Sequence, residues 1–205
     1  MNDTEIRHNF HRKKLRRQHT RKDTLVIDEL GLNHGKCRAD IAVINGHLIG
    51  YEIKSNNDSL RRLEGQIESY NSVFDKVSIV VGDRYINSIQ SHIPKCWGVI
   101  VSVRGSKGAV NFETIRKAQK NKSIEPISIA KLLWRNEAIE ILQKKKLPPK
   151  ILRQPRSVLY EYIANTLSLC QLRQAVRDYF KKRKNWRCPE LPSRYDGLYP
   201  LPPTL

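Results

Sequence analysis

The stretch that decides the fold is RADIAVINGHLIGYEIK, residues 38–54. Two runs rich in apolar and β-branched residues, 39–44 and 48–54, flank Asn45-Gly46, a pair typical of tight hairpin turns. Because side chains alternate along a strand, Glu52 and Lys54 lie on one face while Tyr51 points to the other. The stretch therefore predicts a β-hairpin that presents an acid and a base on one surface.

The register of this hairpin decides whether Asp40 joins Glu52. With a two-residue loop at Asn45-Gly46, position 40 lies opposite position 51 and Asp40 faces away from Glu52. A three-residue loop, either Ile44-Asn45-Gly46 or Asn45-Gly46-His47, places Asp40 on the Glu52 face. We therefore predict an odd loop length or a bulge, because only then do the two acids meet.

The surrounding sequence predicts an α/β fold with a mixed central sheet flanked by helices. Further short β-branched runs predict strands at residues 25–27, 77–81, 99–103 and 110–114. Residues 58–74 predict a helix, because apolar residues recur there at spacings of three and four. A strand, a helix and a further strand form a crossover unit, which requires a parallel pair. Before the sheet, residues 3–20 predict a basic helix capped by Asp3 or Thr4, with Glu5 in its first turn.

Two regions are expected, a sheet domain at residues 1–120 and a helical C-terminal region at 121–205 with a proline-rich tail from Pro189. Helical patterns cover residues 127–145 and 158–182, separated by Leu147-Pro148-Pro149. Ser168 is a plausible N-cap within the second pattern. This arrangement fits either a helix-turn-helix pair or a structural cap on the sheet.

The formal net charge of +18, with a pI near 10.0, indicates a polyanionic partner. Lysines and arginines that neutralise phosphates release counterions, so we expect salt-sensitive, largely sequence-independent binding to DNA. The alternative is that these charge runs are only solvated faces. The candidate nucleic-acid contacts are Arg12, Lys13, Lys14, Arg16, Arg17, Arg38, Arg61 and Arg62.

Composition argues against a membrane or secreted protein and predicts a cytoplasmic location. No run approaches the roughly 18 apolar residues of a membrane span, and the N-terminus is basic and polar. The basic segment 7–22 offers only Phe10 and Leu15 as bulky apolar residues, which also disfavours binding to a membrane surface. The four cysteines stand far apart without metal-binding spacing, so we expect them to be reduced: Cys37, Cys96, Cys170 and Cys188.

Two carboxylates held together repel each other and need a compensating cation. Mg²⁺, or Mn²⁺ in its place, suits Asp40 and Glu52, because it prefers oxygen ligands and also accepts phosphate oxygens. Such an ion lowers the pKa of a bound water, and Lys54 would orient that water or stabilise charge on the phosphate. The alternative is a purely structural role, in which Glu52 and Lys54 form a cross-strand ion pair.

Asp40 followed by Glu52-Ile53-Lys54 resembles the D…(D/E)-x-K signature of the PD-(D/E)XK, or restriction-endonuclease-like, nuclease superfamily. Gln66 and Tyr70 are similar to the Q-x-x-x-Y element of RecB-type nuclease domains. The resemblance covers residues 24–82, although Ala39 stands where the motif has proline. The whole chain also resembles small bacterial and phage-borne proteins of this superfamily.

The resemblance implies roles for individual residues. Asp40, Glu52 and the backbone carbonyl of Ile53 would bind the metal, and Lys54 would assist the water. Gln66 and Tyr70 would lean over the metal or bind the DNA backbone, although Tyr70 also fits a core position. A further acid is implied, for which Glu29 is preferred and Glu5 is the alternative.

The leading hypothesis is a divalent-metal-dependent DNA nuclease, a phosphodiesterase acting in repair, recombination or defence. A rival hypothesis is a DNA-binding protein that has this fold without catalysis. A third is an accessory subunit of a larger nucleic-acid-processing complex. A homodimer is compatible with each of them.

Overall fold

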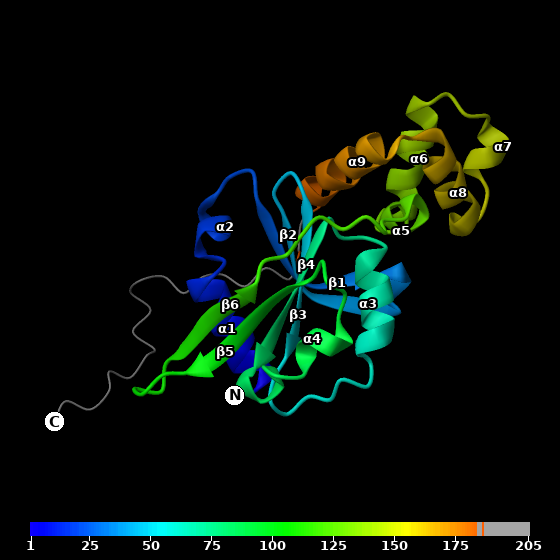
Figure 1. Ribbon diagram of the computed structural model, residues 1–205. Helices are drawn as coiled ribbons and strands as arrows, with labels where there is room; N and C mark the ends of the chain where they lie inside the picture. The colour runs from blue at the N-terminus through cyan, green and yellow to red at the C-terminus, as the bar shows by residue number, and fades with distance from the viewer. Residues whose placement is uncertain (184–185, 187–205) are drawn as a thin grey trace.

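The protein is built on a six-stranded mixed sheet with the strand order β1-β2-β3-β4-β5-β6 (Figure 1). The computed structural model describes residues 1–183 and 186. β3, β4 and β5 run parallel, and the other neighbouring strands are antiparallel. The predicted α/β fold with a mixed sheet is confirmed. The strands are β1 (Leu25–Leu32), β2 (Cys37–Ile44), β3 (Leu48–Lys54), β4 (Lys76–Gly82), β5 (Gly98–Arg104) and β6 (Val110–Arg116).

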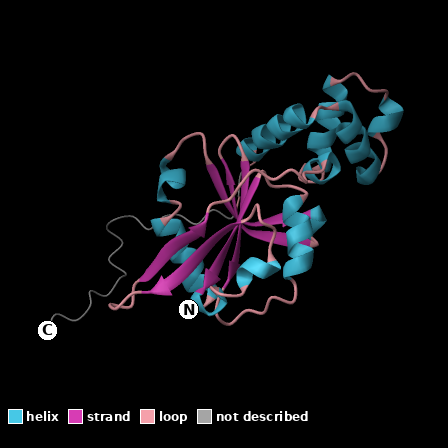
Figure 2. Ribbon diagram, viewed as in Figure 1, coloured by secondary structure: helices cyan, strands magenta, loops and turns pink. Residues whose placement is uncertain are grey.

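Helices flank the sheet and form the C-terminal part of the described chain (Figure 2). The first two are α1 (Asp3–Lys13) and α2 (Arg16–Thr20), so the basic helix expected over residues 3–20 is interrupted, and its N-cap is Asn2 rather than Asp3 or Thr4. The crossover between β3 and β4 contains α3 (Leu63–Asn71), shorter than the predicted helix at 58–74. The remaining helices are η1 (Asn33–Gly35), η2 (Asp83–Tyr85), α4 (Ile89–His92), α5 (Pro126–Ala130), α6 (Arg135–Lys144), α7 (Pro149–Leu152), α8 (Arg156–Thr166) and α9 (Leu169–Lys182).

The hairpin of β2 and β3 has the predicted odd loop. Ile44 pairs with Leu48, which leaves Asn45-Gly46-His47 as a three-residue loop, and Gly46 adopts φ +97°. The Asn45 N–H donates to the His47 carbonyl at 3.2 Å. Because Ile41 pairs with Tyr51, position 40 continues the ladder opposite position 52. The prediction that Asp40 lies on the same face of the hairpin as Glu52 is confirmed.

The two faces of the sheet are buried by different elements. One face carries the larger core, in which α3 and the C-terminal helices pack on strand residues such as Ile79 and Val81. On the other face, Ile6, Phe10 and Leu15 of the N-terminal segment pack against a cluster that includes Ile41 and Val43 of β2. Helix α1 is therefore docked on the sheet through an apolar stripe, with Arg12 and Lys13 exposed and His11 buried.

The C-terminal helices confirm the predicted cap at Ser168, whose side chain accepts a hydrogen bond from the Gln171 N–H at 3.3 Å. Leu159 of α8 and Val176 of α9 belong to the same core cluster as the sheet residues, which supports the interpretation as a structural cap. A DNA-binding role for α8 and α9 stays a prediction. Cys188 and the predicted tail from Pro189 lie outside the described residues, and the three described cysteines are free.

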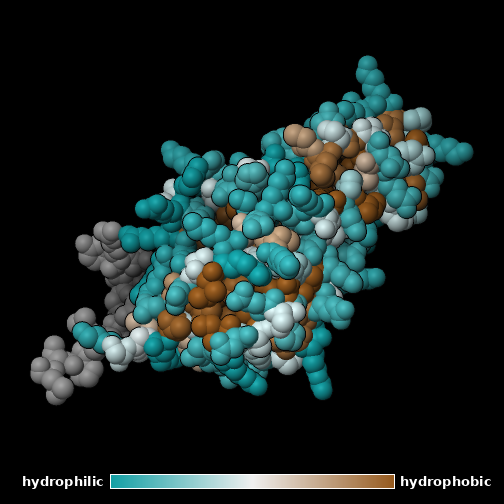
Figure 3. Space-filling view, in the orientation of Figure 1, coloured by the Kyte–Doolittle hydropathy of each residue, from teal (hydrophilic) through white to brown (hydrophobic). Residues whose placement is uncertain are grey.

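Most of the face shown in Figure 3 is hydrophilic, with apolar side chains gathered in patches. Among residues 1–183 and 186, no helix is both long and apolar enough to cross a membrane.

Candidate functional site

A cavity of about 740 Å³ lies where α1, α3 and the first three strands meet. Its lining combines acids and bases and contains most of the residues singled out in the sequence. Arg38 and Arg62 line it, whereas Arg61 does not. The charged and amide side chains in the lining are Asp3, Arg7, Glu29, Lys36, Arg38, Asp40, Glu52, Lys54, Asp58, Arg62 and Gln66.

Glu52 is the most deeply buried acid of the cavity, with 1% of its surface exposed. Its Oε1 lies 2.7 Å from the Lys54 ammonium and accepts a hydrogen bond from Gln66 at 2.6 Å. Its Oε2 accepts a hydrogen bond from the Tyr70 hydroxyl at 2.5 Å. A buried carboxylate is tolerated only when it is paired and hydrogen-bonded, and here three side chains meet that requirement.

Asp40 is held from both sides. Its Oδ2 accepts a hydrogen bond from the Ile53 N–H at 2.7 Å, and its Oδ1 accepts one from Arg7 at 3.0 Å. Burial, and then the neighbouring charge of Glu52, raise the pKa of Asp40 to about 7, although the Ile53 N–H and Arg7 act in the opposite direction. The Asp40 N–H donates to the Tyr70 hydroxyl at 3.1 Å, so Tyr70 links the two acids.

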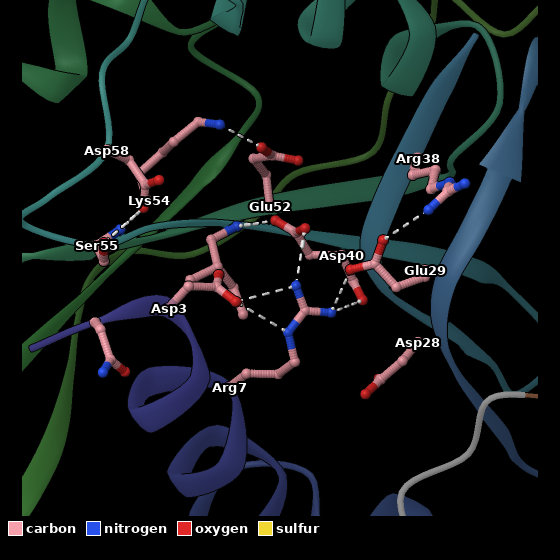
Figure 4. Close-up of polar contacts among 12 residues, drawn as sticks. Asp3, Arg7, Asp28, Glu29, Arg38, Asp40, Glu52, Lys54, Ser55 and Asp58 are labelled. Carbon is pink, nitrogen blue, oxygen red and sulfur yellow. Dashed lines mark hydrogen bonds and ion pairs between the residues drawn. The ribbon is translucent and has the colours of Figure 1, made fainter. Parts of the chain in front are cut away.

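Arg7 of α1 is the cation at the centre of this arrangement (Figure 4). Its guanidinium lies 2.9 Å from Glu29, 3.0 Å from Asp40 and 3.3 Å from Asp3. Burial alone would lower the pKa of Arg7, but Asp40, Asp3 and Glu29 raise it. The guanidinium therefore supplies the positive charge that the carboxylates require.

Sequence reasoning missed Arg7, because it stands in a basic run and was assigned to the general positive charge. One signal was present. Glu29 is expected beside the two acids of the hairpin, and Arg7 follows Ile6 on the helix whose apolar residues must face the sheet. An arginine next to that stripe is carried toward the sheet together with the apolar residues.

The two candidates for the further acid are separated by the structure. Glu29 lines the cavity and pairs with Arg7, and it adopts φ +57°, an unusual conformation for a residue other than glycine. Glu5 pairs instead with Arg104 of β5 at 2.8 Å. Tyr70 is fully buried against the rings of Phe74 and Trp97, so it is a core residue as well as a polar link.

The carboxylate oxygens that could ligate a metal ion are largely engaged by groups of the protein itself. Both oxygens of Glu52 and both oxygens of Asp40 already accept hydrogen bonds or ion pairs. Within the described part of the chain, no group of three or more His, Cys, Asp or Glu side chains is arranged to hold a metal ion. The Mg²⁺ or Mn²⁺ site stays a prediction.

Residues 2–188 match the protein family described as Bacteriophage P4 protein cII. The chain belongs to this family. A curated relative, Protein cII of Enterobacteria phage P4, is 28% identical over 175 residues, which cover 85% of this chain and 65% of the relative. The chain thus spans less than two thirds of that relative's length. No solved structure matches it.

Membership of the cII family corrects the functional interpretation. The match includes residues 24–82, which carried the resemblance to PD-(D/E)XK nucleases, so that assignment is wrong. The predicted metal-dependent phosphodiesterase activity on DNA is wrong with it. The physical reason is that D…E-x-K is a short pattern, and a hairpin that buries an ion-paired acid and lysine has the same spacing. In this cII-family chain, those side chains join a charge network closed by Arg7.

Proposed function

We propose that the chain is a non-catalytic DNA-binding protein with a regulatory role in the cytoplasm. The net charge of +18 supplies the general attraction to a polyanion. The observation that carries the proposal is a docked basic surface at the end of α1 and on α2. Its exposed cations that form no ion pair or side-chain hydrogen bond with another described residue are Lys14, Arg16, Arg17 and Lys22.

The basic surface is held in a fixed orientation. Phe10 contacts the rings of Tyr51 and Phe112 at centroid distances of 5.0 and 5.3 Å, and Leu15 is 1% exposed. Between these apolar anchors, His11 lies 2.9 Å from Asp28 of β1. A helix fixed in this way presents its cations without the entropy cost of ordering a free segment.

The buried charge network gives the acids of the cavity a role in this function. Arg7 ties α1 to Glu29 of β1 and Asp40 of β2, and Tyr70 and Glu52 tie Asp40 to α3 and β3. Removing one partner from such a network leaves an uncompensated buried charge, which is strongly destabilising. The network therefore positions the basic surface rather than reacting with the DNA.

Two of the predicted nucleic-acid contacts are less available than their charge suggests. The Lys13 ammonium donates to the Val110 carbonyl and to Asn111, at 2.5 and 3.1 Å. Arg38 is exposed, but it stands 3.9 Å from Glu29 at the mouth of the acidic cavity. We therefore place the DNA backbone on the α1–α2 surface and not over the cavity.

The test is the salt dependence of binding to labelled duplex DNA. A variant with Lys14, Arg16, Arg17 and Lys22 replaced by Gln should bind more weakly, and the slope of log affinity against log salt should fall by about 3 to 4, since each phosphate contact accounts for about 0.9. The matched control removes the same charge from exposed lysines elsewhere, namely Lys95, Lys107, Lys120 and Lys144.

An equal loss of slope in both variants would show that the charge acts without a defined surface. Absence of duplex binding at low salt would overturn the proposal altogether. The DNA recovered after incubation with Mg²⁺ or Mn²⁺ should remain at full length, and cleavage by the purified protein would contradict the non-catalytic role.

A further inference from the structure

A second cavity, of about 450 Å³, lies between the end of β1 and the C-terminal helices. Its lining includes Leu30 and His34 on the sheet side and residues from the α5–α6 connection, the start of α8 and the end of α9 on the other. The volume falls within the range of small-molecule sites. It shares no lining residue with the first cavity.

The lining is cationic. Lys131, Arg135, Arg156 and Arg183 contribute to it, and among residues 1–183 and 186 no carboxylate lines it. The Glu137 carboxylate neutralises Arg183 through a hydrogen bond from Nε at 2.7 Å. The other three cations form no ion pair with a described carboxylate: Lys131 donates to the Asn33 amide oxygen, and Arg135 reaches only backbone carbonyls. Uncompensated cations around a cavity favour an anion.

An aromatic surface stands at the same place. Trp134 keeps 60% of its surface exposed, although it is one of the largest apolar side chains of the protein. The Arg183 guanidinium lies over the Trp134 ring at 4.3 Å and also lies 5.3 Å from the ring of Trp186. The guanidinium fixes the indole from one side, and the exposed remainder of the ring is free to stack on another planar group.

The backbone is unusual around His34, which lines the cavity directly after β1. Asn33, His34 and Gly35 adopt φ values of +45°, +60° and +84° in succession. Left-handed conformations cost free energy for residues other than glycine and concentrate at binding sites. His34 also stacks on Tyr160 at a centroid distance of 5.4 Å. Its pKa is lowered by burial and then by the positive charges of Arg156 and Lys131, two cations that line the same cavity.

We propose that this cavity binds an unpaired nucleic-acid base together with its phosphate, with the base stacked on Trp134 and the phosphate held by Arg156 and Lys131. The inference rests on the proposed DNA-binding function, because the strand that enters the cavity is part of DNA attracted by the rest of the surface. Stacking on an aromatic ring requires a base that is not already stacked within a duplex, so the ligand is single-stranded.

The experiment compares oligo(dT) with a duplex of the same length by fluorescence anisotropy, with tryptophan fluorescence recorded in parallel. Trp134→Ala should weaken oligo(dT) binding by about 5- to 150-fold, the range found for one stacked base, and leave duplex binding unchanged. Arg156→Gln should weaken it less and lower the salt slope by about 0.7. The control is Tyr162→Ala, which removes another exposed aromatic ring, 39% exposed, from outside this cavity.

The outcomes separate this inference from the proposed function. Duplex binding that is intact while oligo(dT) affinity is the same in wild type, Trp134→Ala and Arg156→Gln overturns the inference alone. Loss of binding to both nucleic acids in the wild type overturns both proposals. A third arm uses deoxyadenosine monophosphate. Quenching of tryptophan fluorescence by the free nucleotide but not by oligo(dT) would assign the cavity to a free nucleotide and would overturn the proposal that a single strand occupies it. Quenching by oligo(dT) that is abolished in Trp134→Ala supports it.

Discussion

Replacing Asp40 by Asn removes the one acid of the cavity whose pKa is raised to about 7. In the unfolded chain this carboxyl group ionises near 3.8, so the folded state holds its proton more tightly. A group with a raised folded pKa contributes stability that is present below the unfolded pKa and is lost as pH rises through the folded pKa. The wild type should therefore lose stability relative to Asp40→Asn between about pH 4 and pH 7.

The magnitude follows from the same shift. Between pH 5 and pH 7, about 2 pH units, the wild type loses about 1.4 kcal/mol of stability per unit relative to Asp40→Asn, or roughly 3 kcal/mol in all. The Asp40 side chain is 19% exposed, and screening by solvent lowers our expectation to about 2 kcal/mol. Any loss of hydrogen bonding in the variant adds a constant that does not change with pH.

The assay is urea unfolding of both proteins at pH 5, 6, 7 and 8, with the difference in unfolding free energy as the readout. Asp23→Asn is the control, because its hydrogen bond from Arg21 lowers the Asp23 pKa, and the difference should stay flat over this pH range. The unfolding free energy of Asp40→Asn minus that of the wild type should rise with pH. A value that stays constant within about 0.5 kcal/mol, or that falls as pH rises, would refute the account of the buried charge network.

Three further perturbations test the packing around the cavity. Arg7→Gln leaves buried acids without their cation and should cost about 3 to 5 kcal/mol in urea unfolding, with faster proteolysis of the N-terminal segment. Tyr70→Phe removes the hydroxyl that links Asp40 and Glu52 and should cost about 1 to 3 kcal/mol in the same assay. Gly50→Ala places a Cβ 2.7 Å from the Phe74 ring and should cost about 1 to 3 kcal/mol, whereas Gly65→Ala meets nothing within 4 Å on a helix and should raise the melting temperature.

The strands and the hairpin loop could be predicted from local sequence patterns. All six strands form where β-branched runs stand, and burial agrees with that pattern in β2 to β5, whereas β6 is mostly exposed. The three-residue hairpin loop was predictable because it is the loop length that brings Asp40 opposite Glu52. Helix ends were predicted less well, as at residues 58–62, where Ser55 and Asp58 form a turn through a hydrogen bond of 2.7 Å before α3 begins.

The site was harder to predict because its decisive partner comes from far away in the sequence. Arg7 and Asp40 are separated by 33 positions, and only the docking of α1 on the sheet brings them together. The second cavity shows the same limit. His34, Trp134 and Arg156 belong to three separate segments, and no spacing within any of them marks a common site.

The same electrostatic requirement underlies both the mistaken nuclease interpretation and the observed structure. Acids that converge on a hairpin must be neutralised, and a bound metal and a guanidinium are alternative ways to meet that need. The sequence pattern of the acids is the same in both cases, so it cannot tell which cation is used. What distinguishes them is whether the lone pairs of the acids face an open position or a protein donor. Here Ile53, Arg7, Tyr70, Gln66 and Lys54 occupy those directions at 2.5 to 3.0 Å. The acids therefore tie the N-terminal helix to the sheet through Arg7, and the DNA contact that we propose is made by cations outside the cavity.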